Sequence, residues 1–274
     1  MKPAAFDYVR PRTLVEAAAA LATNNFAKLL AGGQSLGPML NLRLIRPGLL
    51  IDISHIEEIQ RVEETATTWR IGAGVTHAQL EDAKLPGAEL LSTVAGDIAY
   101  RSIRNRGTIG GSLAHADPAG DWPLALAALD ARVTVRGSDG RLRSIPADRF
   151  IQAAFMTELQ PGEIIVAVEV EKRLADARYG YFKFCRKAGD FPEVSAAVLL
   201  DTKAVHARVF IGALATAPQP LPGIAALLAK QDTKAYREEV LADAISAAAP
   251  SLDAVDRRMR IAALWRALQQ VQSG

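Results

Sequence analysis

The residues best suited to chemistry lie at positions 101–123, which read RSIRNRGTIGGSLAHADPAGDWP. Three glycines, Gly107, Gly110 and Gly111, fall within five positions of this segment. Because glycine has no Cβ and adopts positive φ readily, the backbone here can lie directly against another body. Successive N–H groups in such a turn can form a concave site for an anion. Taken alone, the segment fits a glycine-rich surface loop equally well.

A second glycine-rich stretch, AGGQSLGPMLN at residues 31–41, follows directly on Lys28–Leu30. We expect Lys28–Leu30 to be a buried strand, and a strand that leads into a glycine loop aims backbone amides at a phosphate. The stretch lacks the Gly-Lys-Ser/Thr of a Walker loop and the spacing of a GxGxxG motif. A short helical turn is expected from Pro38. Each loop alone is weak evidence, but the two together predict a diphosphate held from two sides.

The composition excludes several classes of protein. A length of 274 residues predicts about two domains, and a net charge of +2 without long runs of one sign gives no nucleic-acid surface. The single cysteine, Cys185, excludes an internal disulfide and an all-cysteine iron–sulfur site. The four histidines have no metal-ligand spacing. No apolar run approaches the roughly 18 residues of a transmembrane helix, so we expect a cytoplasmic protein.

Sequence patterns place both loops on a framework of strands and helices. Thr13 and Glu16 form a capping-box pattern before an alanine-rich helix, and Asp121 is placed to cap a helix over 122–130. Beyond about residue 173, three strand patterns precede three helical patterns, which indicates an α+β arrangement with a three-stranded antiparallel sheet. A domain boundary is expected at 170–177. The strands are Tyr179–Arg186, Val194–Leu200 and Ala207–Leu214, and the helices are 221–230, 233–248 and 251–271.

Together, AGGQSLGPMLNLRL and IRNRGTIGGSLAHADPAGDWP resemble the FAD-binding medium subunit of the molybdenum hydroxylases, most closely that of aerobic carbon monoxide dehydrogenase. The resemblance covers essentially the whole chain. It implies a two-part N-terminal FAD-binding domain of the PCMH type over residues 1–175, with subdomains of about 1–55 and 56–175. It also implies a C-terminal domain of the carbon monoxide dehydrogenase flavoprotein type over residues 176–274.

The resemblance further implies which residues hold FAD. In the family both glycine loops contact the cofactor, and the backbone amides of residues 32–35 and 108–111 suit its pyrophosphate. His115 matches a histidine that forms no covalent bond in this family, so we expect non-covalent FAD. The matching loop positions are Ala31, Gly32, Gly33, Gln34, Ser35 and Leu36, followed by Thr108, Ile109, Gly110, Gly111 and Ser112.

Four further positions match family residues at the cofactor, and each has an alternative role. Asp121 matches an acidic residue that bonds toward the ribose and adenine, or it caps a helix; the two roles can coexist. Asp117 is a second acidic candidate, or it forms an Asp-Pro turn. Lys183 matches a lysine that approaches the flavin, or it lies on a solvated strand face. Ile165 matches a contact to the ring system, or it is an ordinary core residue of a strand.

The function that the resemblance implies is electron transfer within a heterotrimer. The expected partners are a small [2Fe–2S] subunit and a large molybdenum-cofactor subunit, in a dimer of heterotrimers. Electrons would pass from the clusters through FAD to a quinone, a cytochrome, oxygen or NAD; the hydroxylated substrate stays open. Two alternatives are a self-contained FAD-dependent oxidase and a non-catalytic assembly subunit that has lost FAD. The intact glycine loops argue against the assembly subunit.

Overall fold

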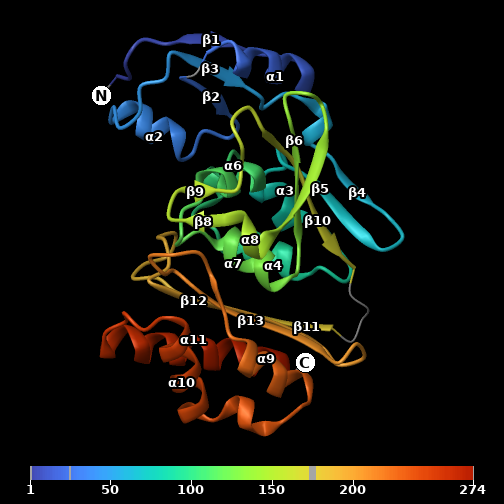
Figure 1. Cartoon of the computed structure of the whole chain (residues 1–274), viewed down its shortest axis with the longest axis vertical. Helices are drawn as coiled ribbons and strands as arrows, with labels where there is room; N and C mark the ends of the chain where they lie inside the picture. The colour runs from blue at the N-terminus through green and yellow to red at the C-terminus, as the bar shows by residue number, and fades with distance from the viewer. Residues whose placement is uncertain (1, 25, 173–176, 274) are drawn as a thin grey trace.

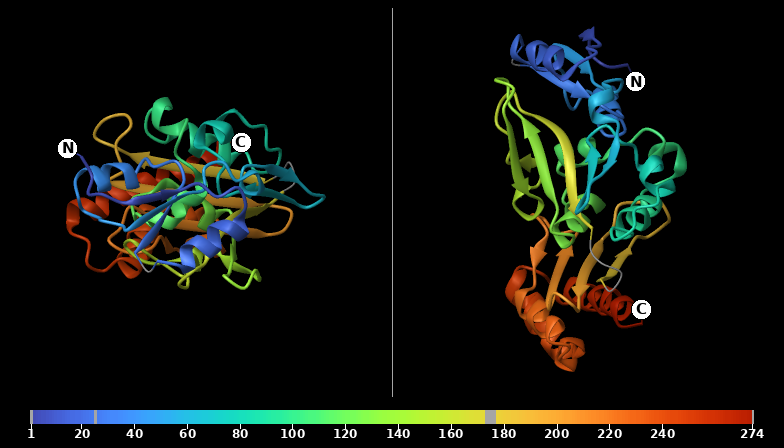
Figure 2. Two further views of the ribbon diagram at one scale, coloured as in Figure 1. Left: turned by 90° about the horizontal axis from the view of Figure 1, so that it is seen from above. Right: turned by 90° about the vertical axis from the view of Figure 1, so that its right-hand side faces the viewer.

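The computed structural model describes residues 2–24, 26–172 and 177–273 of the chain. Three parts follow one another along the longest axis of the molecule in the order of the sequence, with the N-terminal part at the top of Figure 1 and the C-terminal part at the bottom. The side view in Figure 2 shows the middle part between the other two.

The N-terminal part is a small parallel sheet with two helices. Its elements are β1 (Asp7–Val9), α1 (Leu14–Ala22), β2 (Ala27–Leu30), α2 (Leu36–Asn41) and β3 (Leu49–Asp52). The strand order is β1-β3-β2, and β2, the strand predicted before the first glycine loop, is confirmed. It is not the buried strand expected, because Lys28 is exposed and Leu29 and Leu30 are half-buried. The capping box at α1 is half formed: the Thr13 hydroxyl accepts the Glu16 N–H, but the Glu16 carboxylate accepts from the Arg12 N–H instead.

The middle part contains an antiparallel sheet of five strands and a helix that is buried on every side. Its elements are η1 (Glu57–Ile59), β4 (Val62–Glu64), β5 (Thr68–Gly72), α3 (His77–Asp82), α4 (Leu90–Asp97), α5 (Arg101–Arg104), α6 (Ile109–His115), α7 (Asp121–Ala128), β6 (Arg132–Arg136), β7 (Leu142–Pro146), α8 (Ala147–Phe150), β8 (Ile151–Ala153), β9 (Met156–Thr157) and β10 (Ile164–Glu171). The sheet order is β4-β5-β10-β6-β7. Every residue of α7 is buried, which is the position expected of a helix that is apolar all round.

The C-terminal part is an antiparallel sheet with helices on one face, and α7 of the middle part contacts its strands (Figure 1). Its elements are β11 (Ala177–Phe184), β12 (Val194–Asp201), β13 (His206–Gly212), β14 (Gln219–Pro220), α9 (Pro222–Ala229), η2 (Thr233–Tyr236), α10 (Glu238–Ala248) and α11 (Ala254–Ser273). The three predicted strands are confirmed, and β14, only two residues long, adds a fourth beside β13. The expected boundary between residues 175 and 176 lies outside the described residues.

Successive side chains of β11 face α11 and the middle part in turn. The strand therefore joins the C-terminal part to the middle part. Phe182 lies against α11, whereas Tyr179 and Lys183 bond to the middle part. On the α11 side, Gly180 lies so close to the helix that a Cβ would overlap the Ala267 carbonyl oxygen. Neither α11 nor another helix in the described part of the chain is long and apolar enough to cross a membrane.

Replacing Gly180 by alanine is expected to destabilise the protein by about 1–3 kcal/mol, because the helix backbone must move to admit the new methyl group. Urea unfolding of the two proteins measures the difference. The matched control is Gly223→Ala in α9, where a Cβ meets nothing within 4 Å. Equal unfolding midpoints for the two variants would contradict the close contact between β11 and α11.

Candidate functional site

The first glycine loop carries a run of free backbone amides. Residues 31–37 are all half-buried, and Gly33 adopts a positive φ of 75°. Within the described residues, the N–H groups of residues 32–36 donate to no protein acceptor. Helix α2 begins at Leu36, two residues before the predicted Pro38, so the loop is shorter than expected. Free amides at a turn with positive φ can bind an anion such as a phosphate.

The amides of the second loop are already engaged. The N–H groups of Ile109 and Gly110 donate to carbonyls that follow β5, at 3.1 and 2.9 Å. The Gly111 N–H donates to the Thr108 hydroxyl at 3.1 Å, which caps α6. A phosphate at these three amides would have to share or replace hydrogen bonds of the fold, and the predicted contact with pyrophosphate stays a prediction. Ser112, half-buried, keeps its hydroxyl free of partners in the described chain.

The glycines instead let the two loops pack together. A Cβ on Gly32 would overlap the Arg106 carbonyl group, so the first loop lies directly against the second. A Cβ on Gly110 would overlap Ala73, at the end of β5. The sequence therefore predicted correctly that both loops are close-contact sites, although the contact at Gly110 is with the protein itself.

His77, the first residue of α3, lies buried beneath the second loop. Its N–H donates to the Gly107 carbonyl at 2.9 Å, and a Cβ on Gly107 would lie 3.0 Å from its Nδ1. Neither ring nitrogen has a hydrogen-bond partner in the described chain, and the ring centroid lies 5.9 Å from that of Trp122. Burial lowers the pKa of His77 to about 4, so the ring is neutral near pH 7.

Asp121 belongs to a buried cluster that joins α7 to β11. The helix begins at Asp121 and Gly120 is its N-cap, so the predicted cap is wrong by one residue. The side chain turns toward β11 instead, where it accepts from the Lys183 ammonium at 2.8 Å and from the Tyr181 hydroxyl. Burial raises the pKa of Asp121, whereas Lys183 and Tyr181 both lower it. Sequence reasoning missed Tyr181, although residues two apart in a strand share a face.

The solvated-face alternative for Lys183 is wrong. Its side chain is 11% exposed, and besides Asp121 its ammonium bonds the Asp97 carbonyl at 2.9 Å. The positive charge is therefore paired, and the pair has no net charge. Whether Lys183 also approaches a flavin stays a prediction.

The two remaining candidates adopt the structural roles that were foreseen as alternatives. Asp117 forms a turn in which its carboxylate accepts the Ala119 N–H at 2.9 Å, and it is half-buried. Ile165 is 5% exposed and belongs to the hydrophobic core along β10. A cofactor contact at either residue stays a prediction.

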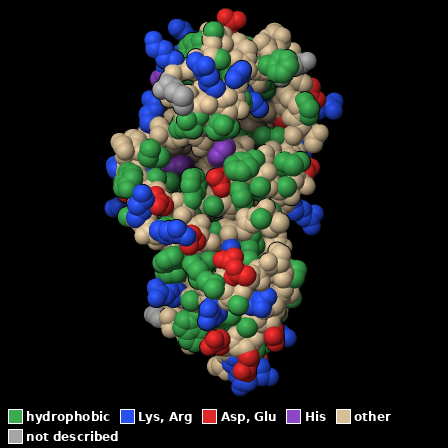
Figure 3. Space-filling view, turned by 90° about the vertical axis from the view of Figure 1, so that its left-hand side faces the viewer, with side chains coloured by type: hydrophobic (Ala, Val, Ile, Leu, Met, Phe, Trp, Pro, Cys, Tyr) green, Lys and Arg blue, Asp and Glu red, His purple; other side chains and the backbone are tan. Residues whose placement is uncertain are grey.

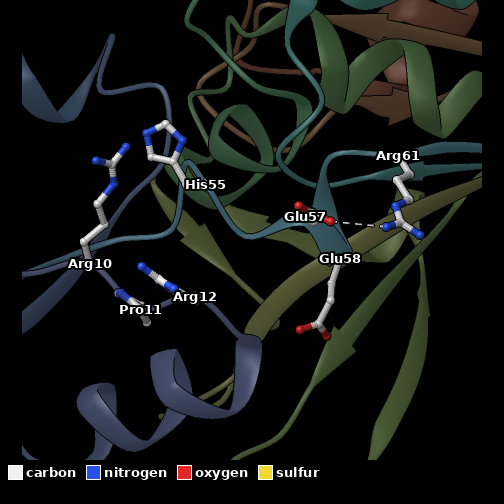
Figure 4. A pocket seen from close by; sticks show the side chains of 7 residues that line it. All are labelled: Arg10, Pro11, Arg12, His55, Glu57, Glu58 and Arg61. Carbon is white, nitrogen blue, oxygen red and sulfur yellow. Dashed lines mark hydrogen bonds and ion pairs between the residues drawn. The ribbon is translucent and has the colours of Figure 1, made fainter.

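Two hollows are visible on the molecule. The face in Figure 3 is hollowed between the N-terminal part and the middle part, and histidine side chains line the hollow. A separate hollow of about 740 Å³ lies where the segment after β1 meets η1 (Figure 4). It contains none of the predicted site residues, and its Arg61–Glu57 ion pair is exposed. Its charged and polar lining is Arg10, Arg12, His55, Glu57, Glu58 and Arg61.

Residues 4–171 match the family model described as "FAD binding domain in molybdopterin dehydrogenase". The match spans more than half of the chain. The chain belongs to this family. It is thus an FAD-binding medium subunit of the molybdenum hydroxylases, an oxidoreductase component, as its sequence motifs predicted.

Relatives and solved structures agree with this assignment. The nicotine 6-hydroxylase medium subunit of Paenarthrobacter nicotinovorans is 35% identical over 249 residues, which cover 89% of this chain and 87% of that one. The carbon monoxide dehydrogenase medium chain of Hydrogenophaga pseudoflava is 36% identical, with 92% and 90% covered. The structure of carbon monoxide dehydrogenase from the same organism matches with a TM-score of 0.91 and 34% identity, covering 100% of this chain and 99% of that one. These matches confirm the predicted α+β fold class.

Gly32→Ala is expected to separate the two loops and to weaken FAD binding by at least about tenfold. The clashing atoms are backbone, so no side-chain rotation relieves the overlap. Reconstitution of the apoprotein with FAD, followed by flavin fluorescence, measures the affinity. Gly37→Ala is the control, because a Cβ there meets no protein atom within 4 Å. Full flavin affinity in Gly32→Ala would show that the loop contact is dispensable.

His77 is expected to make stability fall on acidification. Between pH 6.5 and about 4 the unfolded histidine binds a proton and the folded one does not, so the free energy of unfolding decreases as the pH drops through this window. The loss from this residue is about 2 kcal/mol between pH 7.5 and pH 5. Urea unfolding of wild type and His77→Phe at both pH values measures it. The exposed His55→Gln should keep the wild-type loss, and an unchanged loss in His77→Phe would refute the assignment.

Proposed function

We propose that this subunit passes electrons from the [2Fe–2S] clusters of a partner subunit to an external acceptor within a heterotrimeric molybdenum hydroxylase. The observation that carries the proposal is the run of free amides at residues 32–36, packed directly against the second glycine loop. These amides fit the pyrophosphate of FAD. When bound, FAD supplies the redox chemistry, and the protein binds and orients it.

The loop residues would contact the phosphates of FAD, and the residues of the buried cluster would contact the rest of the cofactor. The first loop would hold the phosphates through its amides, and the Ser112 hydroxyl adds a donor from the second loop. Asp121 and Lys183 would face the remainder of the cofactor as a neutral pair. The proposed set is Ala31, Gly32, Gly33, Gln34, Ser35, Leu36, Thr108, Ile109, Gly110, Gly111, Ser112, Asp117, Asp121, Ile165 and Lys183.

Two observations support the proposal of partner subunits. Its one cysteine cannot ligate a cluster, and the described residues contain no group of acidic, histidine and cysteine side chains that could hold a metal. Relatives are named as a medium subunit, a medium chain and a subunit of the 6-hydroxypseudooxynicotine dehydrogenase complex. We extend this to a small [2Fe–2S] subunit and a large molybdenum-cofactor subunit, assembled as a dimer of heterotrimers.

The division of the chain at residue 175 is also a proposal. Two hydrophobic clusters support it. One spans the N-terminal and middle parts and takes in Tyr181, Ala197 and Phe210 from the near face of the C-terminal sheet, and the other is formed by the C-terminal sheet and its helices. Residues 1–175 would form the FAD-binding domain and residues 176–274 the C-terminal domain. The cytoplasmic location stays a prediction.

Purification of the untagged protein from its native source tests the proposed function. We expect three co-eluting chains whose visible spectrum shows flavin, together with iron and molybdenum in elemental analysis. Flavin in a single chain that turns over a substrate would instead establish a self-contained oxidase. A complex that contains iron and molybdenum but no flavin would establish an assembly subunit.

A further inference from the structure

Tyr181 of β11 places its hydroxyl in the interior, at the contact between two parts of the molecule. The residue is 6% exposed, and its hydroxyl donates to Asp121 Oδ1, the same oxygen that accepts from Lys183. The side-chain amide of Gln270 in α11 bonds the backbone of Tyr181 twice. The Tyr181 N–H donates to Gln270 Oε1 at 2.7 Å, and Gln270 Nε2 donates to the Tyr181 carbonyl at 3.1 Å. The helix therefore fixes the tyrosine, and the tyrosine fixes the carboxylate.

Lys183 and Asp121 each keep one hydrogen-bonding position unused. An ammonium has three N–H donors, and two of them go to the Asp97 carbonyl and to Asp121 Oδ1. Both side-chain contacts to Asp121 reach Oδ1, and Oδ2 has no hydrogen-bond partner among the described residues. One donor and one acceptor are thus available to a ligand, on side chains that are 11% and 7% exposed.

We propose that Tyr181 is a positioning residue of the cofactor site, whose hydroxyl holds the Asp121 carboxylate so that the Lys183 ammonium is fixed at the flavin end. The inference rests on the proposed placement of Lys183 at the flavin. Without the hydroxyl, Asp121 keeps Lys183 as its one side-chain partner in the described chain. The carboxylate can then rotate, and the two free positions lose their fixed orientation.

The charged groups around Asp121 shift its pKa, so the positioning role of Tyr181 can be measured through the pH dependence of FAD affinity. Lys183 and Tyr181 lower the pKa of Asp121, and Asp97, at the end of α4, raises it. Burial is the main cause that raises the pKa of the Tyr181 phenol, followed by Asp121 and Asp97, and Cys185, just after β11, contributes least. Loss of the Tyr181 hydroxyl therefore raises the pKa of Asp121 further. The carboxylate then takes up a proton at higher pH, where Lys183 loses its counter-charge and FAD binding weakens.

The test is FAD affinity as a function of pH, measured by flavin fluorescence on the FAD-depleted native complex. Tyr181→Phe is expected to shift the acid loss of affinity upward by about one to two pH units. Tyr179→Phe is the matched control. It removes a hydroxyl from the same face of the same strand, one that donates to the Gly87 carbonyl at 2.8 Å. It should keep the wild-type profile.

Two further variants separate the possible failures. Asp121→Asn cannot titrate, so its acid transition should vanish, and adding Tyr181→Phe to it should shift nothing. Equal profiles for Tyr181→Phe and Tyr179→Phe would overturn the proposal. In Lys183→Gln, unchanged FAD affinity and an unchanged flavin potential would also overturn it, by removing Lys183 from the flavin. That result leaves the proposed function standing as long as the native complex contains flavin, iron and molybdenum.

Discussion

The backbone of Gly32 lies against the Arg106 carbonyl at a separation that only a residue without a Cβ permits. This contact joins the N-terminal part to the middle part at the point where both glycine loops meet. The two loops differ in the state of their backbone amides. The first loop presents amides with no protein acceptor in the described chain, whereas the second has its amides engaged with β5 and with its own cap. The two loops thus differ in how many of their amides are free, and they lie in direct contact.

The two glycine loops could be predicted from sequence because the demand for glycine is local. A backbone position with no room for a Cβ requires glycine at that residue, whatever fills the space. The sequence does not indicate which neighbour fills it. At Gly110 the space that a Cβ would need is filled by Ala73, which lies 37 residues away in the chain. The pattern therefore located the close contact, whereas this neighbour could not be read from it.

The strands and helices around the loops could be predicted from hydrophobic patterns, whereas the buried cluster of Asp121, Lys183 and Tyr181 could not. The three long strands of the C-terminal sheet have enough residues to show a pattern, but β14, with two residues, has none. Asp121 and Lys183 are 62 residues apart, and nothing in either segment indicates that they pair. The cap at Asp121 was misplaced for the same reason, because a partner on β11 draws the carboxylate away from the helix end.

This pairing changes what Lys183 can do to a flavin. A lone cation would stabilise an anionic reduced ring through its net charge, but Lys183 is neutralised by a carboxylate 2.8 Å from its ammonium. What remains is a dipole, together with one free donor. The influence of a dipole in a medium of low dielectric constant depends on which end faces the ring, so orientation matters more here than charge. A buried pair gives little stability by itself. The Tyr181 hydrogen bond, which fixes that orientation, is therefore better explained by a role at the site than by a role in holding the fold.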